Sequence, residues 1–190
     1  MIAPEPESAE IRVLAAVDAA FAEARRRAGD WLTCHAGCDE CCRRPFAITA
    51  ADARRLQAGL ATLNAATQAD IQSRAREARQ QMSTDFPGDL SRAALTPEPE
   101  WREWFFARHA GLPCPVLDLE TGQCRLYDHR PVACRLAGPL IQIGETITDP
   151  CHWCFSGVSQ ADIITTKIVI HDAEFSATYS HNETVIAFIL

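Results

Sequence analysis

The sequence predicts an α+β fold, with helices in the N-terminal half and short β-hairpins joined by helical turns in the C-terminal half. Apolar residues recur at helical spacing up to residue 82, whereas two glycine turns flanked by short apolar runs follow residue 113. With 190 residues, 47% of them hydrophobic, the chain can bury the core of a single domain. We expect residues 1–33 to form an N-terminal helix, 34–154 a cysteine-rich core and 155–190 a C-terminal extension.

The first helix is predicted over residues 8–29. One face of this segment carries Leu14, Val17, Phe21 and Ala24 at helical spacing. Three arginines and a glycine close the segment, as is typical of a helix C-terminus. We interpret the arginines as a solvated last turn rather than a binding patch, because the helix dipole favours cations there.

Two further helices are predicted before residue 83. One begins near Thr49, where Asp52 completes a capping-box pattern. The other follows a break around Asn64 and is amphipathic. Its apolar positions are Ile71, Ala75, Ala78 and Met82, and its other faces carry Arg74, Arg76 and Arg79. We expect all of these residues to be structural.

Residues 84–99 are rich in proline, glycine and small polar residues and predict an ordered loop or a short linker between two groups of cysteines. A short helix is expected to follow. Its aromatic face, formed by Trp101, Trp104 and Phe105, is expected to pack in the core rather than to bind a ligand.

The segment CPVLDLETGQCRLYDHRPVACR begins the second cysteine group. Two short apolar runs around its Glu-Thr-Gly turn predict a β-hairpin with Cys114 and Cys124 on paired strands. Pro131 suits the first position of a helical turn, which would carry Cys134.

A second hairpin is expected around Gly144, and the sequence CHWC follows it at residues 151–154. Residues 163–190 are rich in β-branched side chains, but neither helical nor strand periodicity prevails there. The sequence leaves the fold of this last segment open.

Composition limits the classes of partner. A formal net charge of −7 argues against a nucleic-acid surface, since it repels phosphate over most of the molecule. No stretch reaches the roughly 18 apolar residues of a membrane span, and the first residues lack the basic and apolar regions of a signal peptide. We therefore expect a cytoplasmic protein with neither nucleic-acid nor membrane partners.

The cysteines carry the strongest chemical signal. In a reducing compartment, a dense and odd-numbered set favours metal binding or catalysis over disulfides. Thiolates two and three residues apart in a turn can converge on one metal ion. We predict a metal centre that organises the fold, as one site or as two four-thiolate sites with one cysteine to spare. The candidate ligands are Cys34, Cys38, Cys41, Cys42, Cys114, Cys124, Cys134, Cys151 and Cys154.

Two positions within the cysteine groups leave alternatives open. Cys41 and Cys42 are adjacent and therefore awkward ligands for one tetrahedral ion, so they point to different centres or only one of them binds. His35 and His152 lie inside the tightest groups and are alternative ligands or proton-transfer groups. Since cysteine already supplies enough ligands, we interpret both histidines as solvated turn residues.

The cysteine pattern resembles the zinc- or iron-chelating proteins of the family named for a CxxCxxCC signature. Cys34, Cys38, Cys41 and Cys42 match that signature, although the first gap here is three residues rather than two. The segment from Cys114 to Arg135 is similar to the family's second signature, and Cys151 or Cys154 would complete the ligand set. The resemblance implies metal binding. A more distant similarity to flagellin lysine-N-methylase implies an iron–sulfur cluster, but its methyl-transfer role does not carry over to this much shorter chain.

Iron–sulfur ligation is favoured over zinc because the cysteine run is crowded and Cys114 precedes a proline, as in cluster-binding runs. Five arginines flank the cysteines and can offset the negative charge of either centre. They are Arg43, Arg44, Arg125, Arg130 and Arg135.

Two other motifs match parts of the pattern. The spacing Cys34-x3-Cys38-x2-Cys41 occurs in radical-SAM enzymes, but no alternating βα pattern follows it here. CHWC could be a thioredoxin-style redox pair, but it lacks the βαβ context of that fold.

Three functions remain open. The first is a metal or cluster protein that supports redox or group-transfer chemistry. The second is a module whose zinc or cluster is structural and which acts through a protein partner, and the third is a metal carrier. Whether the protein is an enzyme is left undecided.

Overall fold

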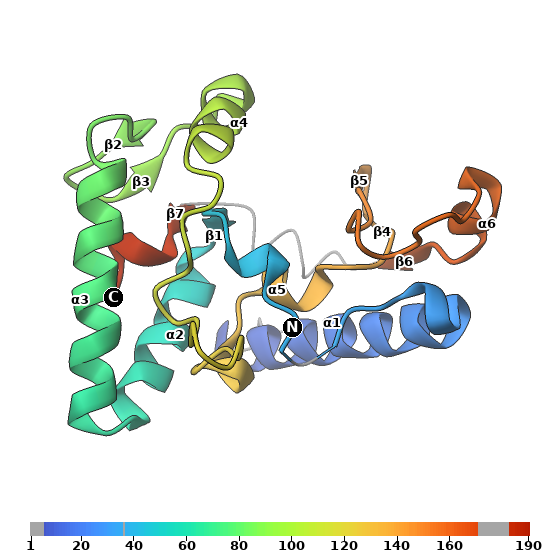
Figure 1. Cartoon of the computed structure of the whole chain (residues 1–190), viewed down its shortest axis with the longest axis horizontal. Helices are drawn as coiled ribbons and strands as arrows, with labels where there is room; N and C mark the ends of the chain where they lie inside the picture. Colours follow the sequence, from blue (N-terminus) through green and yellow to red (C-terminus); the bar gives the residue numbers. More distant parts are fainter. Residues whose placement is uncertain (1–5, 36, 171–182) are drawn as a thin grey trace, which may run out of the picture. The chain divides into compact units, whose positions relative to one another are not determined.

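The computed structural model describes residues 6–35, 37–170 and 183–190, which form two compact units (Figure 1). Unit 1 contains the described residues up to His35 and those from Val132 to Ile170. Unit 2 contains those from Gly37 to Pro131 and from Glu183 to Leu190. The predicted α+β class is confirmed, because α and 3-10 helices make up about half of these residues and strands form only short pairs. The predicted single domain stays a prediction.

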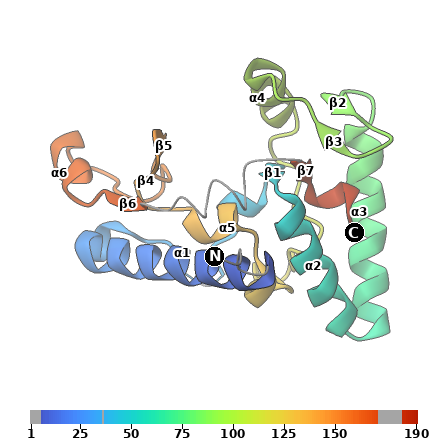
Figure 2. The ribbon, with the colours of Figure 1, turned by 180° about the vertical axis from the view of Figure 1, so that it is seen from behind.

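Unit 1 combines helices with one small sheet. Its helical segments are α1 (Pro6–Ala28), the 3-10 helix η1 (Gly29–Trp31), α5 (Val132–Leu136) and α6 (Gln160–Thr165). Its strands are β4 (Ile141–Ile143), β5 (Thr146–Thr148) and β6 (Ile168–Ile170), in the order β5-β4-β6. β4 pairs antiparallel with β5 and parallel with β6, and the predicted hairpin around Gly144 is confirmed. Helix α1 packs against α5 and β6 (Figure 2).

Helix α1 confirms the first predicted helix but is rotated slightly from the predicted face. Its fully buried residues are Val13, Val17, Ala24 and Ala28, while Leu14 and Phe21 are half-buried. The helix ends where Gly29 adopts φ +53°, a left-handed conformation that glycine takes without strain. None of the helices among the described residues is long and apolar enough to cross a membrane.

Unit 2 is predominantly helical. Its helical segments are η2 (Glu40–Cys42), α2 (Ala50–Thr62), α3 (Ala65–Met82), α4 (Pro99–Arg108), η3 (Tyr127–His129) and η4 (Ile186–Phe188). Two antiparallel strand pairs accompany them, β1 (Ala47–Ile48) with β7 (Thr184–Val185) and β2 (Gly88–Asp89) with β3 (Ala94–Leu95). The C-terminal η4 lies against α3 (Figure 1).

The start of α2 confirms the predicted capping box, and α3 begins with a side-chain cap after the predicted break. Thr49 and Asp52 form a reciprocal capping box at the start of α2. The side chain of Asn64 caps α3 by accepting a hydrogen bond of 3.0 Å from the Thr67 amide. The predicted apolar face of α3 is buried, and its residues are Ile71, Ala75, Ala78 and Met82.

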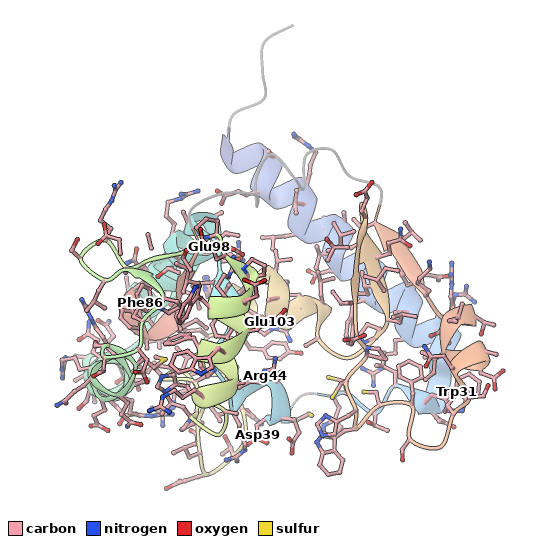
Figure 3. The ribbon with its side chains drawn as sticks, turned by 90° about the horizontal axis from the view of Figure 1, so that it is seen from above. Trp31, Asp39, Arg44, Phe86, Glu98 and Glu103 are labelled. Atoms are coloured by element: carbon pink, nitrogen blue, oxygen red, sulfur yellow. The ribbon has the colours of Figure 1, made fainter. Side chains whose placement is uncertain are left out.

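The aromatic residues of α4 correct the prediction that all three pack in the core. Phe105 is fully buried and meets Phe86 edge-on, with ring centroids 5.9 Å apart. Phe86 is labelled in Figure 3. Trp101 and Trp104 are 62% and 48% exposed. We attribute the exposure of the two tryptophans to Phe86 and Phe188, whose ring centroids lie 4.6 Å apart and which fill the core beside Phe105.

The predicted hairpin around residue 121 is wrong in detail, because only an isolated bridge joins Leu117 to Cys124. The Asp118 carboxylate accepts hydrogen bonds from the amides of Glu120 and Thr121, and this turn replaces a regular ladder. The helical turn predicted after Pro131 is confirmed as α5. In the segment left open, α6, β6, β7 and η4 form, and residues 171–182 lie outside the described residues.

Candidate metal centre

The two units divide the nine cysteines between them, and none of the nine forms a disulfide. Unit 1 contains Cys34, Cys134, Cys151 and Cys154, and unit 2 contains Cys38, Cys41, Cys42, Cys114 and Cys124. The boundary therefore falls within the run CHAGCDECC, which the sequence presents as one loop.

In unit 2, the backbone joins the end of the first cysteine run to the start of the second. The Cys114 amide donates a hydrogen bond of 2.7 Å to the Cys42 carbonyl, and the Gly111 amide donates one of 2.7 Å to the Arg43 carbonyl. Leu117 donates to the Cys114 carbonyl at 3.0 Å and is bridged to Cys124. Cys114 and Cys124 also pack against the same buried core.

The loop before η2 contacts the Glu-Thr-Gly turn of the second signature. A Cβ at Gly122 would lie 2.8 Å from the Gly37 carbonyl oxygen, and Gly122 has φ +70°. Only glycine fits this close approach without displacing the backbone. The glycine that the sequence indicates as a turn residue therefore also forms a contact between the two signatures.

Four thiols of unit 2 influence one another electrostatically. The Cys42 thiol donates a hydrogen bond to the Cys41 sulfur, which holds the pKa of Cys41 at about 7. Burial raises the pKa of Cys114 to about 12, and negative charge at Cys124 and Cys41 raises it further. Burial also raises the pKa of Cys124, again with a contribution from Cys41. The adjacent Cys41 and Cys42 thus bond to each other, and Cys41 influences the pKa of both Cys114 and Cys124.

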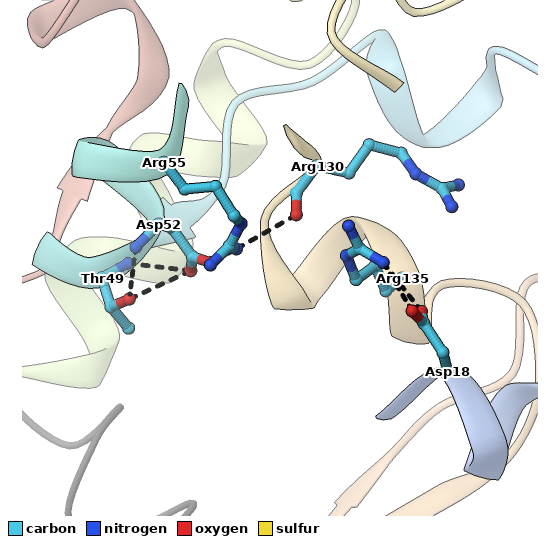
Figure 4. Close-up of polar contacts among 6 residues, drawn as sticks. All are labelled: Asp18, Thr49, Asp52, Arg55, Arg130 and Arg135. Atoms are coloured by element: carbon cyan, nitrogen blue, oxygen red, sulfur yellow. Dashed lines mark hydrogen bonds and ion pairs between the residues drawn. The ribbon is translucent and has the colours of Figure 1, made fainter. Parts of the chain in front are cut away.

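Arg130 supplies positive charge to this group, because its guanidinium lowers the pKa of both Cys41 and Cys124. The guanidinium stacks over the Tyr127 ring at 3.5 Å from its centroid, and its Nε donates to the Tyr127 carbonyl at 2.9 Å. The Arg130 carbonyl accepts a hydrogen bond of 3.1 Å from Arg55, which is paired with the buried Asp52 (Figure 4). The capping box of α2 thereby positions the Arg130 backbone.

The sequence missed one arginine beside the thiols. Arg74 of α3, predicted to be purely structural, donates a hydrogen bond of 3.1 Å to the Cys114 carbonyl and lowers the pKa of that thiol. Nothing in the local pattern distinguishes it from its helical neighbours. Three of the five flanking arginines are bound to carboxylates instead, namely Arg43 to Asp39, Arg125 to Asp70 and Asp118, and Arg135 to Asp18 (Figure 4).

In unit 1, Cys34, Cys151 and Cys154 pack on one buried apolar cluster. Gly138 connects the first two, because its carbonyl accepts a hydrogen bond of 2.9 Å from the Cys151 amide. A Cβ at Gly138 would lie 3.3 Å from the Cys34 Cβ and 3.6 Å from its sulfur. Cys134 lies in α5, four residues before this glycine.

The CHWC segment forms a tight turn in which the Cys154 amide donates to the Cys151 carbonyl at 2.9 Å. Thr33, which directly precedes Cys34 in the sequence, places its hydroxyl 3.7 Å from the Cys154 sulfur. No helix begins at this turn, so it lacks the helix start of a thioredoxin-style pair. His152 is exposed, with its ring 5.0 Å from that of Trp153.

The donor atoms fit iron or zinc, since soft thiolates are the ligands that zinc and iron–sulfur clusters prefer. Among residues 6–35, 37–170 and 183–190, no three His, Cys, Asp or Glu side chains converge closely enough to hold a metal ion. Binding therefore requires thiols on neighbouring turns to rotate toward one another. The same residues form no alternating βα barrel of the radical-SAM kind.

Comparison with known families gives a match to a family described as "Putative zinc- or iron-chelating domain" and named CxxCxxCC. The match covers residues 33–155, about two thirds of the chain, and contains all nine cysteines. The chain belongs to the CxxCxxCC family. Neither curated proteins nor solved structures give a match, and the similarity to flagellin lysine-N-methylase stays a prediction.

Membership of the CxxCxxCC family supports metal binding and leaves the metal as zinc or iron. The matched residues begin beside Cys34 in unit 1, continue through the thiols of unit 2 and end beside Cys154 in unit 1. Family membership therefore concerns both groups of cysteines.

Proposed function

We propose that this CxxCxxCC protein chelates metal through its clustered cysteines, with an iron–sulfur cluster as the favoured form. The observation that most supports this function is the grouping of Cys41, Cys42, Cys114 and Cys124 in unit 2. Two of these thiols are adjacent in sequence, and the other two come from a segment that the Cys42 backbone contacts directly. Clustered thiolates are the ligands that a zinc ion or an iron–sulfur cluster takes.

The surroundings of these thiols suit a negatively charged centre. The Arg130 guanidinium and Arg74 both act on the group, and they would offset the charge of bound thiolates. An iron–sulfur cluster held there would supply one-electron redox chemistry, and redox or group-transfer activity would follow from that property. The protein's own contribution is to hold the thiols, exclude water on the core side and place the cations.

Metal analysis tests this function. Protein purified without oxygen is assayed for iron, zinc and acid-labile sulfide per chain, and its visible spectrum is recorded. We expect iron with matching sulfide and a broad brown absorbance. Stoichiometric zinc without colour would keep the chelating function and overturn the iron–sulfur form, and the absence of both metals after reconstitution would overturn chelation itself.

A ligand substitution completes the test. Cys114→Ser is expected to lower the metal content, because it removes one thiolate of the group at little cost in volume. His152→Ala is the matched control, since His152 lies inside a cysteine group but is exposed and assigned no ligand role. Unchanged metal content in Cys114→Ser would count against the group in unit 2.

A structural zinc module is the second candidate, and the burial of Cys154 favours it. A thiol within the core of unit 1 suits a closed structural site better than an exchangeable one. The exposed Trp101 and Trp104 would then be a contact surface for a protein partner. Zinc that resists exchange with added cadmium for hours would support this candidate, whereas rapid exchange would favour a metal carrier.

A further inference from the structure

We propose that the protein has two separate metal centres, one in each unit, rather than one common centre. The proposal rests on the chelating function above and assigns its ligands. Unit 1 supplies Cys34, Cys134, Cys151 and Cys154 to one centre, and unit 2 supplies Cys41, Cys42, Cys114 and Cys124 to the other. Cys38 is the surplus thiol.

The ligands of the unit 2 centre are held by short backbone contacts. The hydrogen bond of 2.7 Å from the Cys114 amide to the Cys42 carbonyl fixes the two chain segments side by side. The bridge between Leu117 and Cys124 returns the chain beside Cys114. The proposal requires the side chains on these turns to rotate until four sulfurs surround one centre.

Two ligands of the unit 1 centre, Cys34 and Cys151, meet around Gly138. Its carbonyl binds the Cys151 amide, and its α-carbon leaves room for Cys34 where any larger residue would crowd it. The tight CHWC turn places Cys154 three residues after Cys151, which is the spacing of a metal-binding knuckle. Cys134, four residues before Gly138, is the remaining cysteine of the unit and completes four thiols.

The division within CHAGCDECC also supports two centres. Cys34 packs on the apolar cluster of unit 1 together with Cys151 and Cys154. Cys41 and Cys42 lie in η2 of unit 2, on a turn whose neighbours contact residues 111–114. The cysteines of this run therefore lie in two packing environments, which is the arrangement expected if they bind two different centres.

The decisive experiment is a Zn²⁺ titration of the full-length, metal-free, reduced protein. Zinc is a suitable probe because thiolate sites bind it whichever metal they hold in the cell. A chromophoric competitor measures the stoichiometry, and alkylation followed by peptide mass spectrometry identifies the protected cysteines. We expect two zinc ions per chain, with every thiol except Cys38 protected at saturation.

Variants then distinguish the centres. Cys151→Ser is expected to halve zinc binding and expose Cys34, Cys134 and Cys154, while Cys114→Ser halves it and exposes the unit 2 thiols. Cys38→Ser, the matched control, should keep two ions per chain. The set of cysteines that zinc protects from alkylation in the intact protein is a second measurement, and it does not depend on whether a variant folds.

Each other outcome has one meaning. One zinc ion per chain, or loss of protection in both groups from either single substitution, would overturn the two-centre proposal and leave the chelating function intact. Loss of one ion in Cys38→Ser would overturn the assignment of Cys38. No zinc bound by the intact protein, and no iron or zinc in purified material, would instead overturn the proposed function.

Discussion

The Cys114 amide donates a hydrogen bond of 2.7 Å to the carbonyl of Cys42, joining residues that are 72 positions apart in the chain. This contact brings two cysteine signatures together through the backbone, so their proximity does not depend on the rotamer of either thiol. It also explains how metal binding and folding can be linked in unit 2, because a metal that closes the thiols would strengthen a contact already present.

Metal addition is expected to stabilise the protein. Metal-free protein should show a higher Tm as Zn²⁺ is added, and at a free concentration 100 times Kd one site contributes about 2.7 kcal/mol to the free energy of unfolding. Thermal unfolding followed by circular dichroism measures this shift, and Mg²⁺ serves as the control cation because thiolates bind it poorly. An unchanged Tm at saturating zinc would contradict a link between binding and folding.

Alkylation of the metal-free protein should reveal an unusually acidic thiol at Cys41. Its pKa of about 7 lies below the ordinary thiol value, so half of Cys41 is thiolate near pH 7, whereas Cys114, with a pKa of about 12, stays protonated and unreactive. The pH dependence of iodoacetamide labelling, resolved by peptide mass spectrometry, measures the pKa of each of the two thiols. Equal labelling of the two cysteines at pH 7 would be inconsistent with these environments.

A substitution at Cys42 tests the cause of that acidity. Cys42→Ala removes the donor that stabilises the Cys41 thiolate, so the labelling rate of Cys41 at pH 7 should fall several-fold. Cys42→Ser retains a hydroxyl donor, so the labelling rate of Cys41 should fall less in this variant. An identical rate in all three proteins would show that the hydrogen bond does not set the reactivity.

Gly59→Ala should destabilise the protein, although alanine normally stabilises a helix interior. A Cβ at Gly59 would lie 2.4 Å from Cγ of the His129 ring, so the His129 side chain or η3 must shift away from α2. We expect a loss of about 1–3 kcal/mol in the free energy of unfolding by urea. Gly59→Ala combined with His129→Ala should be more stable than Gly59→Ala alone, and a stabilising single substitution would refute this packing.

Gly138→Ala should disturb unit 1 through two effects. Gly138 has φ +119°, which strains an L-residue, and a Cβ there would lie 3.2 Å from a Leu32 methyl and 3.3 Å from the Cys34 Cβ. A loss of about 1–3 kcal/mol is expected in urea unfolding. Gly157→Ala, with φ +75° and nothing within 4 Å, is the control for alanine at a positive φ without crowding, and a smaller loss is expected there.

Asp52→Asn should be among the most destabilising isosteric changes in unit 2. Asp52 is 2% exposed and bonds the Thr49 amide and hydroxyl as well as Arg55. Removal of its charge leaves Arg55 without its buried carboxylate, at a cost of about 3–5 kcal/mol in unfolding free energy. Glu23→Gln, which breaks exposed pairs with Arg26 and Arg27, should change stability little.

Local signals in the sequence predicted most of the helices. The Thr49 and Asp52 capping box and the apolar repeat from Ile71 to Met82 depend on residues within a few positions of each other, and both are confirmed. The prediction that Trp101 and Trp104 pack in the core is wrong. Their exposure depends on Phe86 and Phe188, which lie outside this helix in the sequence and fill the adjacent part of the core.

The sequence by itself determined the α+β class, the helix starts and the family to which the cysteine pattern belongs, because these follow from composition and short-range spacing. Only the tertiary structure decided that Cys34 groups with Cys151, that Cys42 groups with Cys114 and that Arg74 reaches the Cys114 carbonyl. Those contacts depend on how distant segments pack around Gly138 and α3. Spacing along the chain carries no information about that packing, since the same loop can close onto either segment.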